Sequence, residues 1–407
     1  MSATFKICHT SDWHLGHTLH GHAREVEHAA FLRFLLGVLE REAVDALVVP
    51  GDIFDSANPP ASAQSMLYSF LAEARGRLPG LEVLMTAGNH DSAARLGAAD
   101  AILRSIGVRV VGTNRDPMVV ALHDASGRVA ARVAAVPYLR PSDLPLTGEA
   151  LVDGVRAVYD GALDEARDLL EPGQALIAMG HCHMVDATQS ELSERKILGG
   201  LQNALPVDLF AEDVDYVALG HLHLAQAVRP HVHYCGSPIP LSLPEESYAH
   251  QLRIVRFEGG RVAQQVVHRV PRTVDVYRIP RQGPGPLEEA LTQLAQLELS
   301  SELPASRHPF VEVRVRLDEP VPDLRQRIDA VVGDRPMRLI HIGVEYTGVA
   351  GSLADAGPRR QLGDLTVEQV FRQAYARRYD GEPGEPLIAA FHEIASAARQ
   401  RLEERES

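Results

Sequence analysis

The sequence has few cysteines, no long hydrophobic run and no excess of positive charge, and each of these features excludes a class of protein. Its 407 residues include only three cysteines, at Cys8, Cys182 and Cys235. Three widely spaced cysteines provide neither a disulfide framework nor the CxxC spacing of a zinc knuckle. We therefore expect reduced thiols that are mostly buried.

Membrane segments and export signals are also missing. No run of about 18 apolar residues is present, so we expect no membrane-spanning helix. Residues 1–6 lack the basic and then apolar profile of a signal peptide. These observations predict a cytoplasmic protein with no membrane partner.

The formal net charge is −14. Proteins that bind nucleic acid through bulk electrostatics are usually basic, so this chain must attract any phosphate-bearing ligand locally. Its 19 histidines could create such a place if enough of them converge on metal ions.

The length and the hydrophobic content of 45% suit one large domain plus one or two smaller pieces. The first part of the chain alternates helical patterns with apolar runs of strand length. These runs lie at residues 5–10, 46–50, 81–86, 175–179 and 216–219, and each ends in a cluster with Asp, Asn or His. In layered α/β proteins, ligands gather at the carboxyl ends of strands. We therefore predict a layered α/β core in which these clusters meet.

The clusters contain residue types that bind metal ions. Asp12 and His14 are two residues apart, so on an extended segment they point to the same side. The two carboxylate oxygens of Asp52 could bridge two ions. The other candidate ligands are one amide and three imidazoles: Asn89, His181, His221 and His223. Such a mixture suits Mn²⁺, Fe²⁺ or Zn²⁺, and a pair of these ions can activate water and neutralise a phosphate, which predicts a two-metal phosphoesterase.

Each motif alone is common by chance, but their order is specific. DxH, GDxxD, GNHD, GH and GHxH occur in succession, each after a predicted strand. With the stretches HTSDWHLGHTL, GDIFDSANPP, DYVALGHLH and YCGSPIPLS, the chain resembles the calcineurin-like metallophosphoesterase superfamily. Within it, the chain is similar to bacterial nuclease subunits that act in double-strand-break repair. The resemblance covers residues 5–270 strongly and implies two central sheets flanked by helices.

The resemblance also implies a role for each candidate residue. Two Mn²⁺ ions are expected, the first bound by Asp12, His14 and His223, and the second by Asn89, His181 and His221. Asp52 would lie between them. His90 would contact the scissile phosphate and protonate the leaving oxygen, which suits an imidazole because its proton exchanges near neutral pH.

Three further residues are candidates for orienting roles: Asp55, Asp91 and His183. Asp91 would orient His90 or cap the helix that begins near Ser92. His183 competes with His181 as the ligand, and the Gly-His pair directly after the apolar run favours His181. The remaining nearby histidines are expected outside the ligand set: His9, His17, His20, His22 and His28. Of these, His17 and His20 could touch substrate.

Beyond the core, residues 271–346 predict a small α+β unit. It contains predicted helices at 287–299 and 323–332, and predicted strands at 309–317 and 338–342. The resemblance implies that this unit caps the active-site side and contacts DNA. Arg314 and Arg316 lie on the polar face of their strand, where they could contact phosphate. We favour the alternative, that they form a solvated surface.

The C-terminal part predicts a linker at 347–363 and two amphipathic helical segments within 364–407. Phe371 and Phe391 lie on their apolar stripes. These stripes either pack back on the core or bind a partner. The resemblance implies docking on the coiled-coil root of an SMC-like ABC ATPase.

The resemblance further implies a homodimer, by position through helices at 61–74 and 93–105. Burial of Met66, Leu67 and Phe70 in the subunit's own core is the competing explanation.

The function implied is a manganese-dependent nuclease that cuts duplex DNA ends and hairpins with its ATPase, in repair and recombination at the nucleoid. A free-standing phosphodiesterase or phosphatase of the same superfamily is the alternative. A phosphoprotein phosphatase is expected to have Arg where Ser56 and Asp91 occur, and a small-molecule phosphodiesterase would not need residues beyond 270.

Overall fold

The computed structural model describes residues 4–144, 151–185, 187–188, 205–319 and 321–347. These residues belong to one compact unit, Met1–Thr347. The predicted linker and the two C-terminal helical segments with Phe371 and Phe391 lie outside the described residues. Within the described part of the chain, no helix has both the length and the apolar character needed to span a bilayer.

The first sheet has six strands in the order β14-β13-β1-β4-β5-β6. Its parallel strands are β1 (Thr4–His9), β4 (Ala46–Pro50), β5 (Glu82–Thr86) and β6 (Val108–Val111). Two antiparallel strands extend it beyond β1, namely β13 (Gln251–Glu258) and β14 (Arg261–Arg269). The helices of this part of the chain are α1 (Glu25–Glu42), α2 (Ala61–Arg77), α3 (Ala93–Gly97) and α4 (Asp100–Ser105).

The second sheet also has six strands, in the order β11-β12-β10-β9-β8-β7. They are β7 (Val119–His123), β8 (Val129–Ala135), β9 (Ala175–His181), β10 (Tyr216–Gly220), β11 (Gln226–Arg229) and β12 (Val232–Tyr234). Strands β8, β9, β10 and β12 are parallel, whereas β7 and β11 are antiparallel edges. Helix α5 (Leu151–Asp168) belongs to this half.

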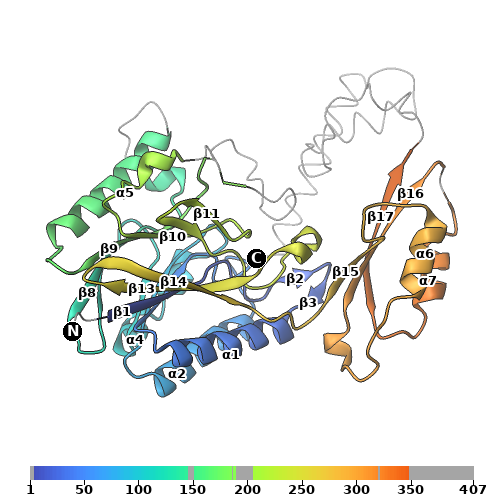
Figure 1. Ribbon diagram of the computed structural model, residues 1–407, viewed down its shortest axis with the longest axis horizontal. Coiled ribbons are helices and arrows are strands. Elements are labelled where there is room, and N and C mark those ends of the chain that lie inside the picture. Colours follow the sequence, from blue (N-terminus) through green and yellow to red (C-terminus); the bar gives the residue numbers. More distant parts are fainter. Residues whose placement is uncertain (1–3, 145–150, 186, 189–204, 320, 348–407) are drawn as a thin grey trace, which may run out of the picture. The chain divides into compact units, whose positions relative to one another are not determined.

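The two sheets pack face to face between helices. One core cluster joins Ile7 and Val48 of the first sheet to Ile177 of the second, and all three are fully buried. A second cluster lies between the first sheet and α1 with α2, and a third between the second sheet and α5. Figure 1 shows α1 and α2 in blue on one side and α5 in green on the other. The predicted α/β fold with two central sheets is therefore confirmed.

The apolar patterns explain these elements. Strand β4 is buried along its whole length, as expected for a parallel strand covered on both faces. Helix α1 buries Phe31, Leu35 and Val38 at helical spacing. It ends where Ala43 adopts a left-handed conformation with φ of 50°. The predicted strands of the two central sheets agree with the observed ones to within about two residues, whereas the strand predicted at 338–342 extends to Tyr346.

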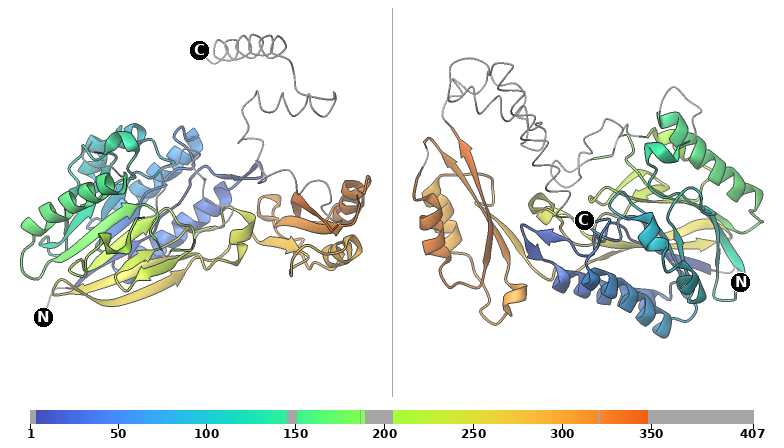
Figure 2. Two further views of the ribbon diagram at one scale, coloured as in Figure 1. Left: turned by 90° about the horizontal axis from the view of Figure 1, so that it is seen from above. Right: turned by 180° about the vertical axis from the view of Figure 1, so that it is seen from behind.

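A third sheet is built by residues beyond 270. Its three parallel strands are β15 (Val276–Ile279), β16 (Phe310–Leu317) and β17 (Arg338–Tyr346), with helices α6 (Leu287–Ala295) and α7 (Leu324–Val332). These elements, orange in Figure 2, enclose a core of their own that includes Val313 and Ile328. The short hairpin of β2 (Thr18–Leu19) and β3 (His22–Ala23) contributes Leu19 to a small cluster with Val276 and Phe310.

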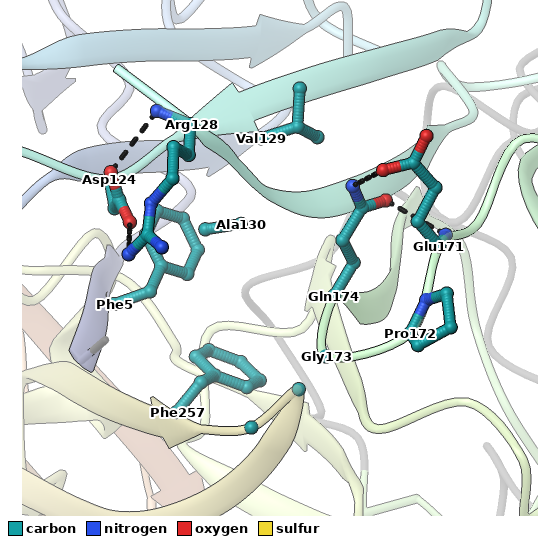
Figure 3. A pocket seen from close by; sticks show the side chains of 12 residues that line it. Phe5, Asp124, Arg128, Val129, Ala130, Glu171, Pro172, Gly173, Gln174 and Phe257 are labelled. Atoms are coloured by element: carbon teal, nitrogen blue, oxygen red, sulfur yellow. Dashed lines mark hydrogen bonds and ion pairs between the residues drawn. The ribbon is translucent and has the colours of Figure 1, made fainter. Parts of the chain in front are cut away.

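A pocket of about 520 Å³ lies at the amino ends of β1, β8 and β9 (Figure 3). Its polar lining groups already bond one another, because Arg128 donates to Asp124 at 3.1 Å and Gln174 donates to Glu171 at 3.3 Å. Ligands of parallel α/β sheets bind at the opposite, carboxyl ends of the strands. This pocket is therefore a poor candidate for the active site.

Candidate metal centre

The predicted ligands come together at the carboxyl ends of five parallel strands. Three groups of side chains could each hold an ion, because within each group the potential ligand atoms lie within 4.8 Å of one another. The groups are Asp12, His14 and His223; His14, Asp52 and His90; and Asp12, Asp52 and His181. Asn89 joins them, since its Oδ1 is 2.9 Å from His181 Nε2 and 3.0 Å from His221 Nδ1. All seven predicted ligands and His90 thus meet, although β1 and β10 are about two hundred residues apart in sequence.

The backbone is strained where it presents these side chains. Asp12, His14 and Asp52 have φ of 54°, 46° and 50°, and His221 has φ of 99°. Asp, Asn and His tolerate the left-handed region better than most residues, and such outliers gather at functional sites. The Gly before Asn89 has a different reason, because a Cβ at Gly88 would collide with the Asp52 side chain and backbone.

Charge in the centre is concentrated and buried. Burial alone would lower the pKa of His181, but the carboxylates of Asp52 and Asp12 raise it to about 9. Burial would raise the pKa of Asp52, but the imidazoles of His181 and His14 hold it well below its usual range. The carboxylates around His181 therefore attract positive charge strongly.

One polar atom shows directly that the centre suits a cation. His14 Nε2 is buried without a hydrogen-bond partner in the described structure, and it lies 3.5 Å from Asp52 Oδ2. Buried polar atoms normally have a partner. An unpartnered imidazole nitrogen beside a carboxylate fits a metal ion, and the mixed imidazole, carboxylate and amide donors suit a divalent one. The residues present define a divalent metal site.

Three acceptors outside the cluster bond the histidines through Nδ1. Asp55 Oδ1 is 3.3 Å from His14 Nδ1, and the carbonyl oxygen of Pro50 is 2.9 Å from His181 Nδ1. Glu245 Oε1 is 3.0 Å from His223 Nδ1. A proton held on Nδ1 leaves the lone pair of Nε2 for a metal ion. Asp55 was among the predicted orienting residues, whereas the Pro50 carbonyl and Glu245 were not.

Asp91 ties two loops of the centre together. Its carboxylate accepts hydrogen bonds from the backbone N–H groups of Ile53, Phe54 and Gly88 at 3.1, 2.9 and 2.9 Å. Burial, and then the charge of Asp52, raise the pKa of Asp91 to about 6. The helix cap that was the alternative role belongs to Ser92, whose side chain accepts from the backbone N–H of Arg95.

The catalytic candidate His90 lies beside the cluster and is partly exposed. Its Nδ1 is 2.7 Å from the carbonyl oxygen of Asp55, and its ring centroid is 4.6 Å from that of His14. Its backbone N–H donates to Asp52 Oδ1 at 2.9 Å. This position allows His90 either to contact substrate or to join His14 and Asp52 as a ligand.

The other histidines separate from the cluster. His183 is half-buried and belongs to none of the three groups that the described residues form, whereas His181 belongs to one. His9 is buried and bonds the Tyr216 hydroxyl at 2.9 Å, and His28 bonds the carbonyl oxygen of Trp13 at 3.0 Å. His20 lies against His341 of the third sheet, with ring centroids 5.2 Å apart.

Comparison with known families agrees with this geometry. The family model described as "Calcineurin-like phosphoesterase" matches residues 5–225, more than half of the chain. The chain belongs to this family of metallophosphoesterases. A second model, described as "Type 5 capsule protein repressor C-terminal domain" (SbcD_C), matches residues 272–379.

Curated relatives narrow the assignment. The SbcD component of the nuclease SbcCD from Rhodobacter capsulatus is 38% identical over 389 residues, which cover 91% of this chain and 94% of the relative. The protein of the same name from Escherichia coli K12 is 32% identical, with 91% and 92% covered, and that of Bacillus subtilis is 34% identical, with 63% and 68% covered. The chain therefore belongs to the SbcD family, and it is a hydrolytic phosphodiesterase of the nuclease type.

Proposed function

We propose that the protein is a manganese-dependent DNA nuclease that shortens duplex ends and opens hairpins together with an SbcC-like ABC ATPase. The observation that carries the proposal is the convergence of seven ligand-type side chains and His90 at one place. Such a substrate would place the protein at the nucleoid, where it would serve DNA repair and recombination.

The residues would divide the metal ions between them. Asp12, His14 and His223 would hold the first Mn²⁺, Asn89, His181 and His221 the second, and Asp52 would bridge the two. Two divalent ions supply the activation of water and the neutralisation of charge on the phosphate. The ligand set suits Mn²⁺ better than Mg²⁺ or Ca²⁺ because imidazole nitrogen is softer than oxygen.

The chain's own groups would position the substrate and move protons. The carbonyl of Asp55 accepts from His90 Nδ1, which would turn Nε2 of His90 toward the leaving oxygen for proton donation. The carboxylate of Asp91 clamps the loops of Asp52 and His90 together, and so keeps the bridging carboxylate and the acid in register.

We assign the remaining parts of the chain to contacts with partners. Residues 1–270 would form the nuclease domain and residues 271–346 a DNA-contacting cap. Cap residue Arg314 is half-buried and donates to the carbonyl oxygen of Pro280. Arg316 is exposed and lies 3.4 Å from Glu345, an ion pair that water screens, so it is the better phosphate contact of the two.

The proposed homodimer rests on exposed apolar residues of two helices. Leu67 and Phe70, which could have supported it, are only 1% and 4% exposed and pack in the subunit's own core. Tyr68 of α2 and Ile102 of α4 are 37% and 71% exposed. These two helices are the ones that the family resemblance assigns to the dimer contact, so we assign Tyr68 and Ile102 to a contact with a second copy of the chain.

The nuclease proposal is tested against its alternatives with a panel of substrates. The purified protein is offered linear duplex, hairpin DNA, a phosphopeptide and a chromogenic phosphodiester in Mn²⁺, Mg²⁺ or Zn²⁺. We expect Mn²⁺-dependent shortening of the duplex and opening of the hairpin. Hydrolysis of the phosphopeptide without any DNA cleavage would instead indicate a free-standing phosphatase.

The proposed docking of the ATPase is tested in the tail. Phe371→Glu combined with Phe391→Glu places a charge on each predicted apolar stripe without shortening the chain. We expect the double variant to keep basal Mn²⁺-dependent cleavage and to lose co-elution with the SbcC-like partner, because amphipathic helices bind through their apolar faces. Co-elution at wild-type strength would contradict the docking assignment, and unfolding of the nuclease core would identify the tail as a structural strap.

A further inference from the structure

Glu245 is a buried carboxylate whose surroundings direct it at the metal centre. It lies in the short 3₁₀ helix Leu243–Ser247, after the YCGSPIPLS stretch, and it is fully buried. Its Oε1 is 3.0 Å from His223 Nδ1 and 2.9 Å from the Ser242 hydroxyl, and its Oε2 accepts from the backbone N–H of Leu241 at 2.9 Å. In the described structure, its ion-pair partner is His223.

The cost of burying Glu245 indicates a purpose beyond holding its loop. An ionised carboxylate in a water-free site is unfavourable unless it is paired and hydrogen-bonded. A neutral side chain could accept from Leu241 and Ser242 without that cost. The negative charge of Glu245 has its main effect on His223, because a carboxylate holds the Nδ1 proton firmly and makes Nε2 a stronger electron donor.

Two other predicted histidine ligands, His181 and His14, have weaker outer acceptors. His181 Nδ1 faces the neutral carbonyl oxygen of Pro50, and Asp55, which faces His14, is 31% exposed. Water screens an exposed carboxylate and leaves a fully buried one at full strength. Glu245 is therefore the outer acceptor with the largest expected effect on a ligand.

We propose that Glu245 is a positioning residue that fixes the Nδ1 proton and the ring orientation of His223. It thereby sets the Mn²⁺ affinity of one half of the metal centre, the predicted site formed by Asp12, His14 and His223. This inference rests on the proposed two-metal function. It makes the two halves unequal, since His223 of one half faces a buried carboxylate, whereas His181 of the other faces a backbone carbonyl.

The test compares Glu245→Ala and Glu245→Gln with wild type by calorimetric titration of Mn²⁺. We expect the affinity for one of the two bound ions to fall by about 10–100-fold in Glu245→Ala, with the affinity for the other unchanged. Glu245→Gln should have a smaller effect, because its amide oxygen can still accept from Nδ1. Cleavage measured against Mn²⁺ concentration should show a raised half-saturation point with near-normal rates at saturation, a rescue that a merely damaged fold would not show.

A matched control and a double variant separate positioning from stability. Glu27 is likewise buried, at 3% exposed, but it pairs with Arg24, so Glu27→Gln should leave both Mn²⁺ affinities unchanged even if the melting temperature falls. Combining Glu245→Ala with His223→Ala should weaken Mn²⁺ no further than His223→Ala alone, as expected for residues that act through one contact.

The outcomes distinguish this inference from the proposed function. If the wild-type protein binds no Mn²⁺, the proposed function fails and the inference fails with it. If the wild type binds two ions and the folded Glu245 variants bind both equally well, only the role of Glu245 is refuted. Glu245→Leu keeps most of the side-chain volume but offers no acceptor for His223 Nδ1, so it decides the question if the alanine variant does not fold.

Discussion

His90→Ala is expected to slow DNA cleavage by about 10²–10⁴-fold while both metal ions stay bound, because the role proposed for this imidazole is proton donation. Its Nδ1 faces the carbonyl oxygen of Asp55 at 2.7 Å, so the ring is held in one orientation beside His14. The measurement pairs single-turnover cleavage of a hairpin with elemental analysis of the purified variant.

A surface histidine provides the control for that variant. His123 of β7 is 39% exposed and bonds Glu82 at 3.0 Å, so His123→Ala should cleave at the wild-type rate. The competing role of His90 is ligation, since its ring lies within one group with His14 and Asp52. Loss of one ion in His90→Ala would establish ligation and remove the proposed acid.

Asp52→Asn is expected to weaken the binding of both metal ions and to abolish cleavage. Asp52 Oδ2 lies 3.5 Å from His14 Nε2 and 3.3 Å from His181 Nε2, so one carboxylate faces both halves of the centre. Asn keeps the shape and tolerates the left-handed φ of 50°, so the substitution removes charge with little change of backbone. The loss should exceed the roughly 10–100-fold that removal of an outer hydrogen-bonding partner costs.

His183→Ala serves as the control for Asp52→Asn and also tests the choice between two histidines. His183 belongs to none of the groups that the described residues form, so its removal should leave two ions bound. Equilibrium dialysis with Mn²⁺ measures both variants. An Asp52→Asn protein with two ions at wild-type affinity would refute bridging, and loss of an ion in His183→Ala would show that the ligand had been assigned to the wrong histidine.

The sequence predicted the parts of the fold and the site that depend on local patterns. Continuous apolar runs identified β4 and β9, and the polar residues directly after them identified Asp52 and His181 as members of one cluster. This works because parallel strands carry their ligands at one edge, so strand order need not be known. The boundary of α6 was less accurate, since the helix ends at Ala295 and not near residue 299.

Residues that act through long-range contacts could not be predicted in this way. Glu245 follows no strand and looks like one of several acids in a loop, and only the fold brings it to His223, 22 residues earlier. The Pro50 carbonyl carries no side-chain signal at all. Asp91 was singled out, but its backbone partners Ile53 and Phe54 are nearly 40 residues away, so its clamping role required the structure.

Strand β1 is the first strand of the described residues, yet one of its two neighbours in the sheet is β13, with Thr4 opposite Glu258. A ribosome delivers Asp12 and His14 early and His221 and His223 more than two hundred residues later. Pairings between such distant segments form slowly, and they cannot form before both segments exist. A nascent chain therefore holds only some of the predicted ligands, and the metal centre can form only once the whole core has been synthesised and closed.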